Sequence, residues 1–156
     1  DWGFDNPDEA SAFETCDIEQ AYCDYFKLVE QSAACGLFDI IGHPDLIKKF
    51  GYRAPQDSNA VFEAENAMLQ AAKKAGVALE ISSAGLRKPV KEIYPHPSIV
   101  QRACALDIPF AYGSDAHSPA EVGRAMDECL SLLQKFGKKE VVSFTKRQRK
   151  MVRFVG

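Results

Sequence analysis

The sequence predicts an α/β fold in which strands and helices alternate, arranged as a parallel sheet or as part of a barrel. Short apolar runs of strand length recur between longer segments whose apolar residues repeat with the period of a helix. Strands joined through helices run parallel, with right-handed crossovers. Because only about four strands fit in 156 residues, a complete eight-stranded barrel is excluded, which leaves a small open α/β domain or the second half of a barrel.

Four helices are predicted where apolar residues recur at intervals of three and four. A glycine follows three of them, at the position where a left-handed residue commonly ends a helix. We expect helices at 17–35, from about 61 to Gly76, at 99–106 and at 119–136. Ser118, Pro119 and Glu121 have the pattern of a capping box at the start of the last one.

Short runs of apolar residues predict the strands, and a polar loop follows each of the first three. We expect strands at Leu37–Gly42, Val77–Ser82 and Ile108–Tyr112, with one or two more in 140–144 and 151–154. In the loop after the third strand, Gly113 allows the backbone to pass close to a ligand.

Side chains suited to chemistry come where the strands end. His43 follows the first strand directly, and Asp115 and His117 follow the third, two residues apart. Since the carboxyl ends of parallel strands share one edge of a sheet, these side chains should lie close together. Imidazole and carboxylate groups are ligands of zinc, iron and manganese, so we favour a metal site over ordinary polar loops.

The loop after the second strand adds positive charge. Arg87 and Lys88 follow a Ser-Ser-Ala-Gly turn, where a guanidinium beside a metal centre can bind an oxyanion such as phosphate. Arg53, in the loop after His43, is a weaker candidate for the same role. Glu80 lies within the second strand. From there it could bind a metal directly or form an ion pair that supports a metal ligand, and its position is equally consistent with both roles.

Composition excludes several classes of function. The net charge is -3, and the one basic cluster, Lys146–Lys150, is short and flanked by apolar residues, so we expect no nucleic-acid partner. The sequence contains no apolar span long enough to predict membrane insertion. Five cysteines without a Cys-x-x-Cys pair indicate reduced core thiols in a cytoplasmic protein.

His96, between two prolines at a helix start, is expected to cap that helix or face solvent.

Five fragments of the sequence, in this order, resemble the PHP (polymerase and histidinol phosphatase) family of metal-dependent phosphoesterases, in its histidinol-phosphatase branch. The Asp-x-His pair alone would be a weak signal, whereas five ordered fragments are specific. The fragments are Trp2–Asp5, Ile41–Asp45, Leu79–Ile81 with Gly85–Lys88, Ile93–Pro95 and Gly113–His117.

The resemblance implies a distorted seven-stranded βα barrel with up to three divalent metals, zinc, iron or manganese. It implies hydrolysis of a small phosphorylated substrate, L-histidinol phosphate, to L-histidinol and phosphate in histidine biosynthesis. Under this resemblance His43, Asp115 and His117 would be metal ligands, Asp115 and His117 would act in catalysis, and Arg87 would hold the substrate phosphate.

The chain departs from the family because it lacks the N-terminal ligands, which include a His-x-His pair, a further His and a Glu on an early strand. A further family His is expected just before Asp1. We therefore expect residues 1–156 to be a single but incomplete PHP-type domain, the C-terminal part of the barrel, with about one ligand left for each metal. Such a chain should be inactive or weakly active, and its exposed barrel edges should favour self-association.

Two other functions stay open. The chain could be a non-catalytic α/β module that binds a phosphorylated ligand or a partner domain through the Arg87 loop. It could also be a PHP phosphoesterase that acts on nucleotides. Bound metal would favour an enzyme, whereas phosphate binding by a metal-free protein would favour the module.

Overall fold

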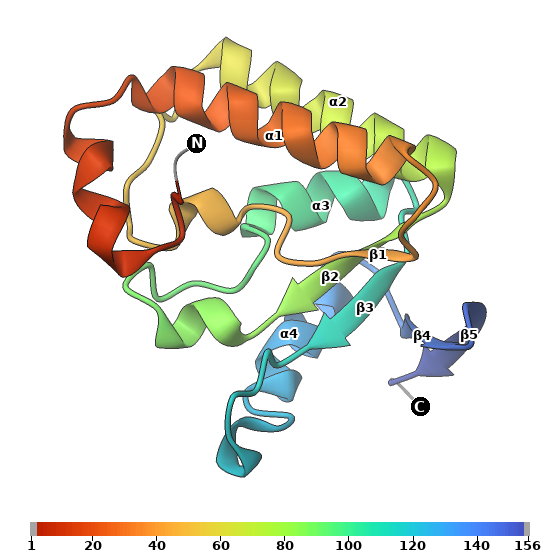
Figure 1. Cartoon of the computed structure of the whole chain (residues 1–156). Helices are drawn as coiled ribbons and strands as arrows, with labels where there is room; N and C mark the ends of the chain where they lie inside the picture. The colour runs from red at the N-terminus through yellow and green to blue at the C-terminus, as the bar shows by residue number, and fades with distance from the viewer. Residues whose placement is uncertain (1–2, 155–156) are drawn as a thin grey trace.

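The computed structural model describes residues 3–154, so Trp2 of the family-like segment Trp2–Asp5 lies outside the described residues. A parallel sheet with the order β1-β2-β3 forms its centre (Figure 1). Its strands pair in register, with Ile41 beside Leu79 and Leu79 beside Phe110. The prediction of a parallel α/β fold is confirmed. The strands are β1 (Ile40–Ile41), β2 (Ala78–Ser82) and β3 (Phe110–Gly113).

The helices begin and end where local chemistry predicts. The Asp17 and Ser58 side chains cap the first two helices by accepting backbone N–H groups of Gln20 and Val61. The second helix ends at Gly76, whose φ of 69° only glycine adopts readily. The α-helices are α1 (Ile18–Ala34), α2 (Asn59–Ala75), α3 (Pro97–Ala105) and α4 (Met126–Lys135). Short 3₁₀ turns are η1 (Pro7–Glu14), η2 (Leu46–Lys48), η3 (Ala84–Arg87) and η4 (Pro119–Glu121).

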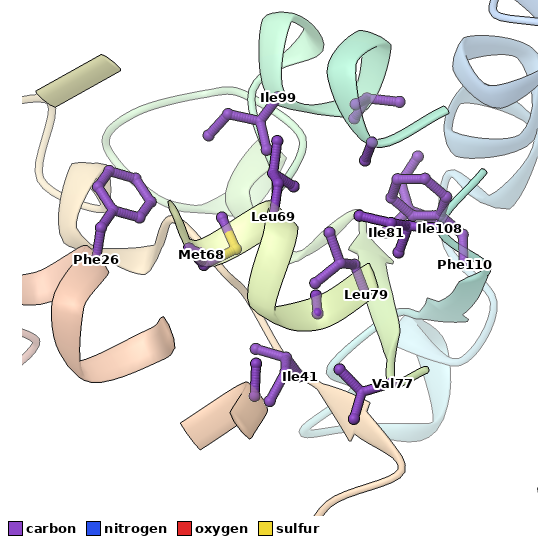
Figure 2. Close-up of a cluster of buried hydrophobic side chains, with 14 of the residues drawn as sticks. Phe26, Ile41, Met68, Leu69, Val77, Leu79, Ile81, Ile99, Ile108 and Phe110 are labelled. Carbon is purple, nitrogen blue, oxygen red and sulfur yellow. The ribbon is translucent and has the colours of Figure 1, made fainter. Parts of the chain in front are cut away.

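The main core lies between the helices and one face of the sheet (Figure 2). In Figure 1, α1 and α2 run side by side, and α3 lies between them and the sheet. Because strand residues alternate between faces, Leu79 and Ile81 of β2 point into this core, while Ala78 and Glu80 belong to the other face. The strand therefore presents Glu80 on the side away from the core.

A hairpin covers part of the second sheet face. Strands β4 (Glu140–Thr145) and β5 (Gln148–Arg153) pair antiparallel, which confirms strands near the C-terminus. Val142 of β4 packs against Ala78 and Ala111. At its tip, Arg147 contacts Asp39 at 3.0 Å, so the hairpin is attached near the start of β1.

The first strand is shorter than Leu37–Gly42, the predicted range. Only Ile40 and Ile41 pair with β2, and β1 has no partner on its other edge among residues 3–154. Leu37 is 71% exposed and Phe38 49% exposed. The apolar run alone therefore gave the wrong strand length, because a strand needs a neighbour along its whole length.

The predicted helix 119–136 is interrupted, which corrects that expectation. It divides into η4 and α4, and left-handed residues Gly123 (φ 72°) and Ala125 (φ 54°) lie between them. The carbonyl of Arg124 accepts hydrogen bonds from the hydroxyl groups of Ser83 (2.6 Å) and Tyr112 (3.0 Å). These tertiary bonds replace the bonds of a continuous helix.

Within residues 3–154, no helix has both the length and the apolar character needed to cross a membrane. All five cysteines are free thiols. Cys129 is buried in the core, but Cys35 is exposed, so the expectation of core thiols is wrong for Cys35.

Candidate active site

Three predicted strand-end groups meet at the carboxyl end of the sheet. The His43 ring lies between two carboxylates: its Nδ1 is 2.7 Å from Glu80 Oε2, and its Nε2 is 3.9 Å from Asp115 Oδ2. All three side chains are partly buried, with 16–34% of each side chain exposed. The structure thus brings together His43 and Asp115, as the strand pattern predicts, and places Glu80 behind the histidine.

The approach of Glu80 depends on a glycine in the neighbouring strand. A β-carbon on residue 113 would lie 1.8 Å from Glu80 Oε1, far inside any real contact. Gly113 therefore provides space for a carboxylate of the protein, whereas the sequence led us to expect space for a ligand.

Two of the three candidate ligands, His43 and Asp115, have a left-handed backbone. The φ angles are 42° at His43 and 49° at Asp115. Such conformations cost on the order of 1–2 kcal/mol in a non-glycine residue and persist where neighbouring bonds hold them. Here the Tyr25 hydroxyl donates to the His43 carbonyl (3.1 Å), the His43 N–H donates to Glu80 (3.0 Å), and Arg87 donates to the Asp115 carbonyl (3.0 Å).

Arg87 supports the Asp115 loop. Its Nη2 group donates to the carbonyl oxygens of Ser114 (2.8 Å) and Asp115 (3.0 Å), and its Nε lies 3.5 Å from Glu121. Its Nη1 is buried and has no protein partner among the described residues. A small cavity of about 210 Å³, whose charged lining residues are Arg87, Arg124 and Glu128, adjoins this side chain. Arg87 thus orders the loop and keeps one unused donor.

His117 lies on the same loop, but within residues 3–154 no contact joins it to His43. Its Nδ1 is 2.9 Å from the Asp115 carbonyl, and its backbone N–H donates to Glu121 Oε2 at 2.8 Å. The bond to Glu121 corrects the predicted capping box. Ser118 makes no side-chain cap, and the hydrogen bond to His117 is the largest influence lowering the pKa of Glu121.

Arg53 lies in the loop after His43, as its sequence position requires, and has an acidic partner there. It pairs with Glu92 at 2.5 Å, and within residues 3–154 no contact joins it to His43 or Asp115. Both residues line a cleft of about 650 Å³ between α1, α2 and α3. Phosphate binding by Arg53 therefore stays an untested prediction, on a side chain that already has a partner.

The contact with Glu80 raises the pKa of His43 above its usual value. Burial opposes this shift, and the negative charges of Glu80 and Asp115 add to it. His96 shifts the other way, because burial and the nearby Lys48 lower its pKa. The His96 side chain accepts the Ser98 N–H and caps α3, as expected for its position.

The side chains that could bind a metal would supply only part of a metal site. His43 Nε2 and Asp115 Oδ2 lie 3.9 Å apart. Two bonds of about 2.1 Å to one ion can span this separation only at an angle wider than the tetrahedral one. The described chain, however, contains no group of three or more His, Cys, Asp or Glu side chains that could hold an ion. A protein site usually needs at least three such ligands, so these residues do not complete one.

Sequence reasoning missed the residues that brace the His43 loop. The Tyr25 hydroxyl also accepts the Leu46 N–H at 3.1 Å. Lys48 is 1% exposed and joins Asp45 (2.8 Å) to Glu92 (3.3 Å). Asp45 in turn accepts the His96 N–H at 2.7 Å, which ties the loops after β1 and β2 together. The closest signal in the sequence was the His-Pro-Asp triplet at 43–45.

Comparisons with known proteins point to one family. No family profile matches the chain. A Deinococcus radiodurans protein assigned as a histidinol-phosphatase is 43% identical over 150 residues, which is 96% of this chain and 55% of the relative. The histidinol-phosphatase of Bacillus subtilis is 30% identical over 119 residues, covering 72% of this chain and 44% of the relative.

A solved structure gives the same result. The crystal structure of a Listeria monocytogenes protein assigned as a histidinol phosphatase superposes with a TM-score of 0.65 at 38% identity, covering 71% of this chain and 44% of that one. The chain is thus a member of the PHP class of α/β proteins. More narrowly, it is a homologue of the histidinol-phosphatases, and it spans about half the length of the curated relatives it matches.

Proposed function

We propose that this chain forms one part of the active site of a metal-dependent phosphomonoesterase that hydrolyses L-histidinol phosphate. The observation that carries the proposal is the convergence of His43 and Asp115, from the ends of β1 and β3, on one point with 3.9 Å between their donor atoms. Homology to histidinol-phosphatases supports the substrate. Residues 1–156 would be one incomplete PHP-type domain, a portion of the distorted seven-stranded barrel.

The proposal gives each of these residues a role. His43, Asp115 and His117 would hold zinc, iron or manganese, which supply Lewis-acid stabilisation and an acidic bound water in such centres. Asp115 and His117 would also contact the reacting groups. Arg87 would orient the substrate phosphate through its unused Nη1 while its Nη2 fixes the Asp115 loop.

Turnover measurements test the proposal. Phosphate release from histidinol phosphate, with nucleotides as the comparison, is measured in the presence of Mn²⁺ or Zn²⁺. The chain alone should be weak or inactive, because the described residues provide too few ligands. Any activity should prefer histidinol phosphate and be lost in His117→Ala. Equal activity in His117→Ala, or a preference for nucleotides, would contradict the assignment.

A phosphate-binding module is the second candidate. The buried Nη1 of Arg87 and the cavity beside it support this function as well, since neither needs a metal. Metal-free protein that binds inorganic phosphate, without turnover under any metal condition, would favour the module. Loss of that binding in Arg87→Met would place the phosphate at this cavity.

A further inference from the structure

One carboxylate oxygen controls both the backbone and the ring of His43. Glu80 Oε2 accepts the His43 backbone N–H at 3.0 Å and lies 2.7 Å from the ring Nδ1. The N–H direction is not aligned for a regular hydrogen bond, since Nδ1 has no hydrogen-bond partner among the described residues. A negative charge 2.7 Å away nevertheless favours a proton over a lone pair on Nδ1. We therefore expect the neutral ring to carry its proton on Nδ1.

The same carboxylate is poorly placed to bind anything else. Oε2 already serves two groups of His43, and Oε1 lies against the backbone at Gly113, where even a β-carbon has no space. Direct ligation by Glu80 would require it to leave His43. Of the two roles open to Glu80 from sequence, the geometry thus favours the one behind the ligand.

We propose that Glu80 is a positioning residue that holds His43 as the Nδ1-protonated tautomer, so that an unprotonated Nε2 faces Asp115. A buried carboxylate of this kind fixes both the rotation of the imidazole and the nitrogen that is free to donate its electron pair. The proposal rests on the proposed function only for what Nε2 binds. The tautomer itself depends on this chain alone.

Nuclear magnetic resonance of the imidazole nitrogens tests the tautomer in metal-free protein at a pH of about 9, where ordinary imidazoles are neutral. The other two histidines are internal controls. His117 Nδ1 lies 2.9 Å from a carbonyl and should be protonated, whereas His96 Nδ1 accepts the Ser98 N–H and should not be.

Two substitutions separate position from charge. Glu80→Ala removes the acceptor, so His43 should shift toward the Nε2-protonated form while His96 and His117 keep theirs. Glu80→Gln keeps a side-chain oxygen, so His43 should retain the Nδ1 proton. Wild-type His43 protonated on Nε2, or an unchanged Nδ1 proton in Glu80→Ala, would overturn the proposal. If Glu80→Ala does not fold, the wild-type spectrum decides.

Zinc titration provides a second readout. Loss of such a supporting carboxylate typically weakens metal binding about 10–100-fold, so Glu80→Ala should bind Zn²⁺ less tightly than Glu80→Gln. Equal affinities would contradict a positioning role. If wild-type protein binds no Zn²⁺ but shows the expected tautomers, the proposed function fails while the assignment of Glu80 stands.

Discussion

Glu80 Oε1 lies 1.8 Å from the place where a β-carbon on residue 113 would be. The carboxylate of β2 can therefore occupy its position only because residue 113 of β3 is a glycine. This pair sets the position of His43, because the other oxygen of Glu80 holds both the backbone and the ring of that histidine.

Replacement of Gly113 should therefore disturb the site. Gly113→Ala should displace Glu80 and lower the free energy of unfolding by about 1–3 kcal/mol, the usual cost of overpacking. Urea denaturation measures this change.

Gly42→Ala is the matched control, since a β-carbon there meets Glu80 Oε2 at an ordinary 3.6 Å. Its stability should stay close to that of the wild type. Similar losses in both variants would show that the close packing at Gly113 is not specific.

Arg87 should control the order of the Asp115 loop. Arg87→Lys cannot reproduce a guanidinium that bonds two carbonyl oxygens, so backbone amides of residues 114–118 should exchange hydrogen several-fold faster. Hydrogen-exchange mass spectrometry measures the rate. Lys88→Met is the control, because no described contact joins Lys88 to this loop. Unchanged exchange in Arg87→Lys would remove Arg87 from its supporting role.

Acid should lower the stability that Glu92 provides through its contacts with Arg53 and Lys48. Burial opposes ionisation of Glu92, but the hydrogen bond from Arg53 and the charge of Lys48 outweigh it, so the pKa of Glu92 is lowered. A lowered carboxyl pKa adds stability above the unfolded value, 4.5, and this stability is lost as the pH falls through the folded pKa. Thermal melts between about pH 6 and pH 3 should show this loss.

Glu92→Gln should have a flatter pH profile over that range. Arg53→Met should flatten it less, because Lys48 still contacts Glu92 at 3.3 Å. A Glu92→Gln profile as steep as that of the wild type would mean that other carboxyl groups cause the acid sensitivity.

We also expect self-association through the open edge of β1. Leu37, Phe38 and Ile40 are exposed beside a strand with no second neighbour among residues 3–154. Light scattering should show a mass that rises with concentration, and a Leu37→Lys, Phe38→Lys variant should reduce it. Leu28→Lys, at an exposed position of α1, should not. A monodisperse wild-type monomer would contradict this expectation.

The sequence predicted the features that depend on local patterns. The period of apolar residues located α1 and α2, and strand ends located His43 and Asp115. The interruption after Glu121 depended on hydroxyl groups of Ser83 and Tyr112, which are distant in sequence. The pairing of Arg53 with Glu92 and the fit of Glu80 against Gly113 were equally hidden, because they need the packed structure.

Equilibrium binding of Zn²⁺ is the most direct test of the central claim that His43 and Asp115 form part of a metal-dependent phosphatase site. Wild-type protein should bind Zn²⁺ weakly, His43→Ala and Asp115→Asn should abolish this binding, and His96→Ala should leave it unchanged. Equal binding by all four proteins, or no binding by the wild type even at millimolar Zn²⁺, would contradict the claim.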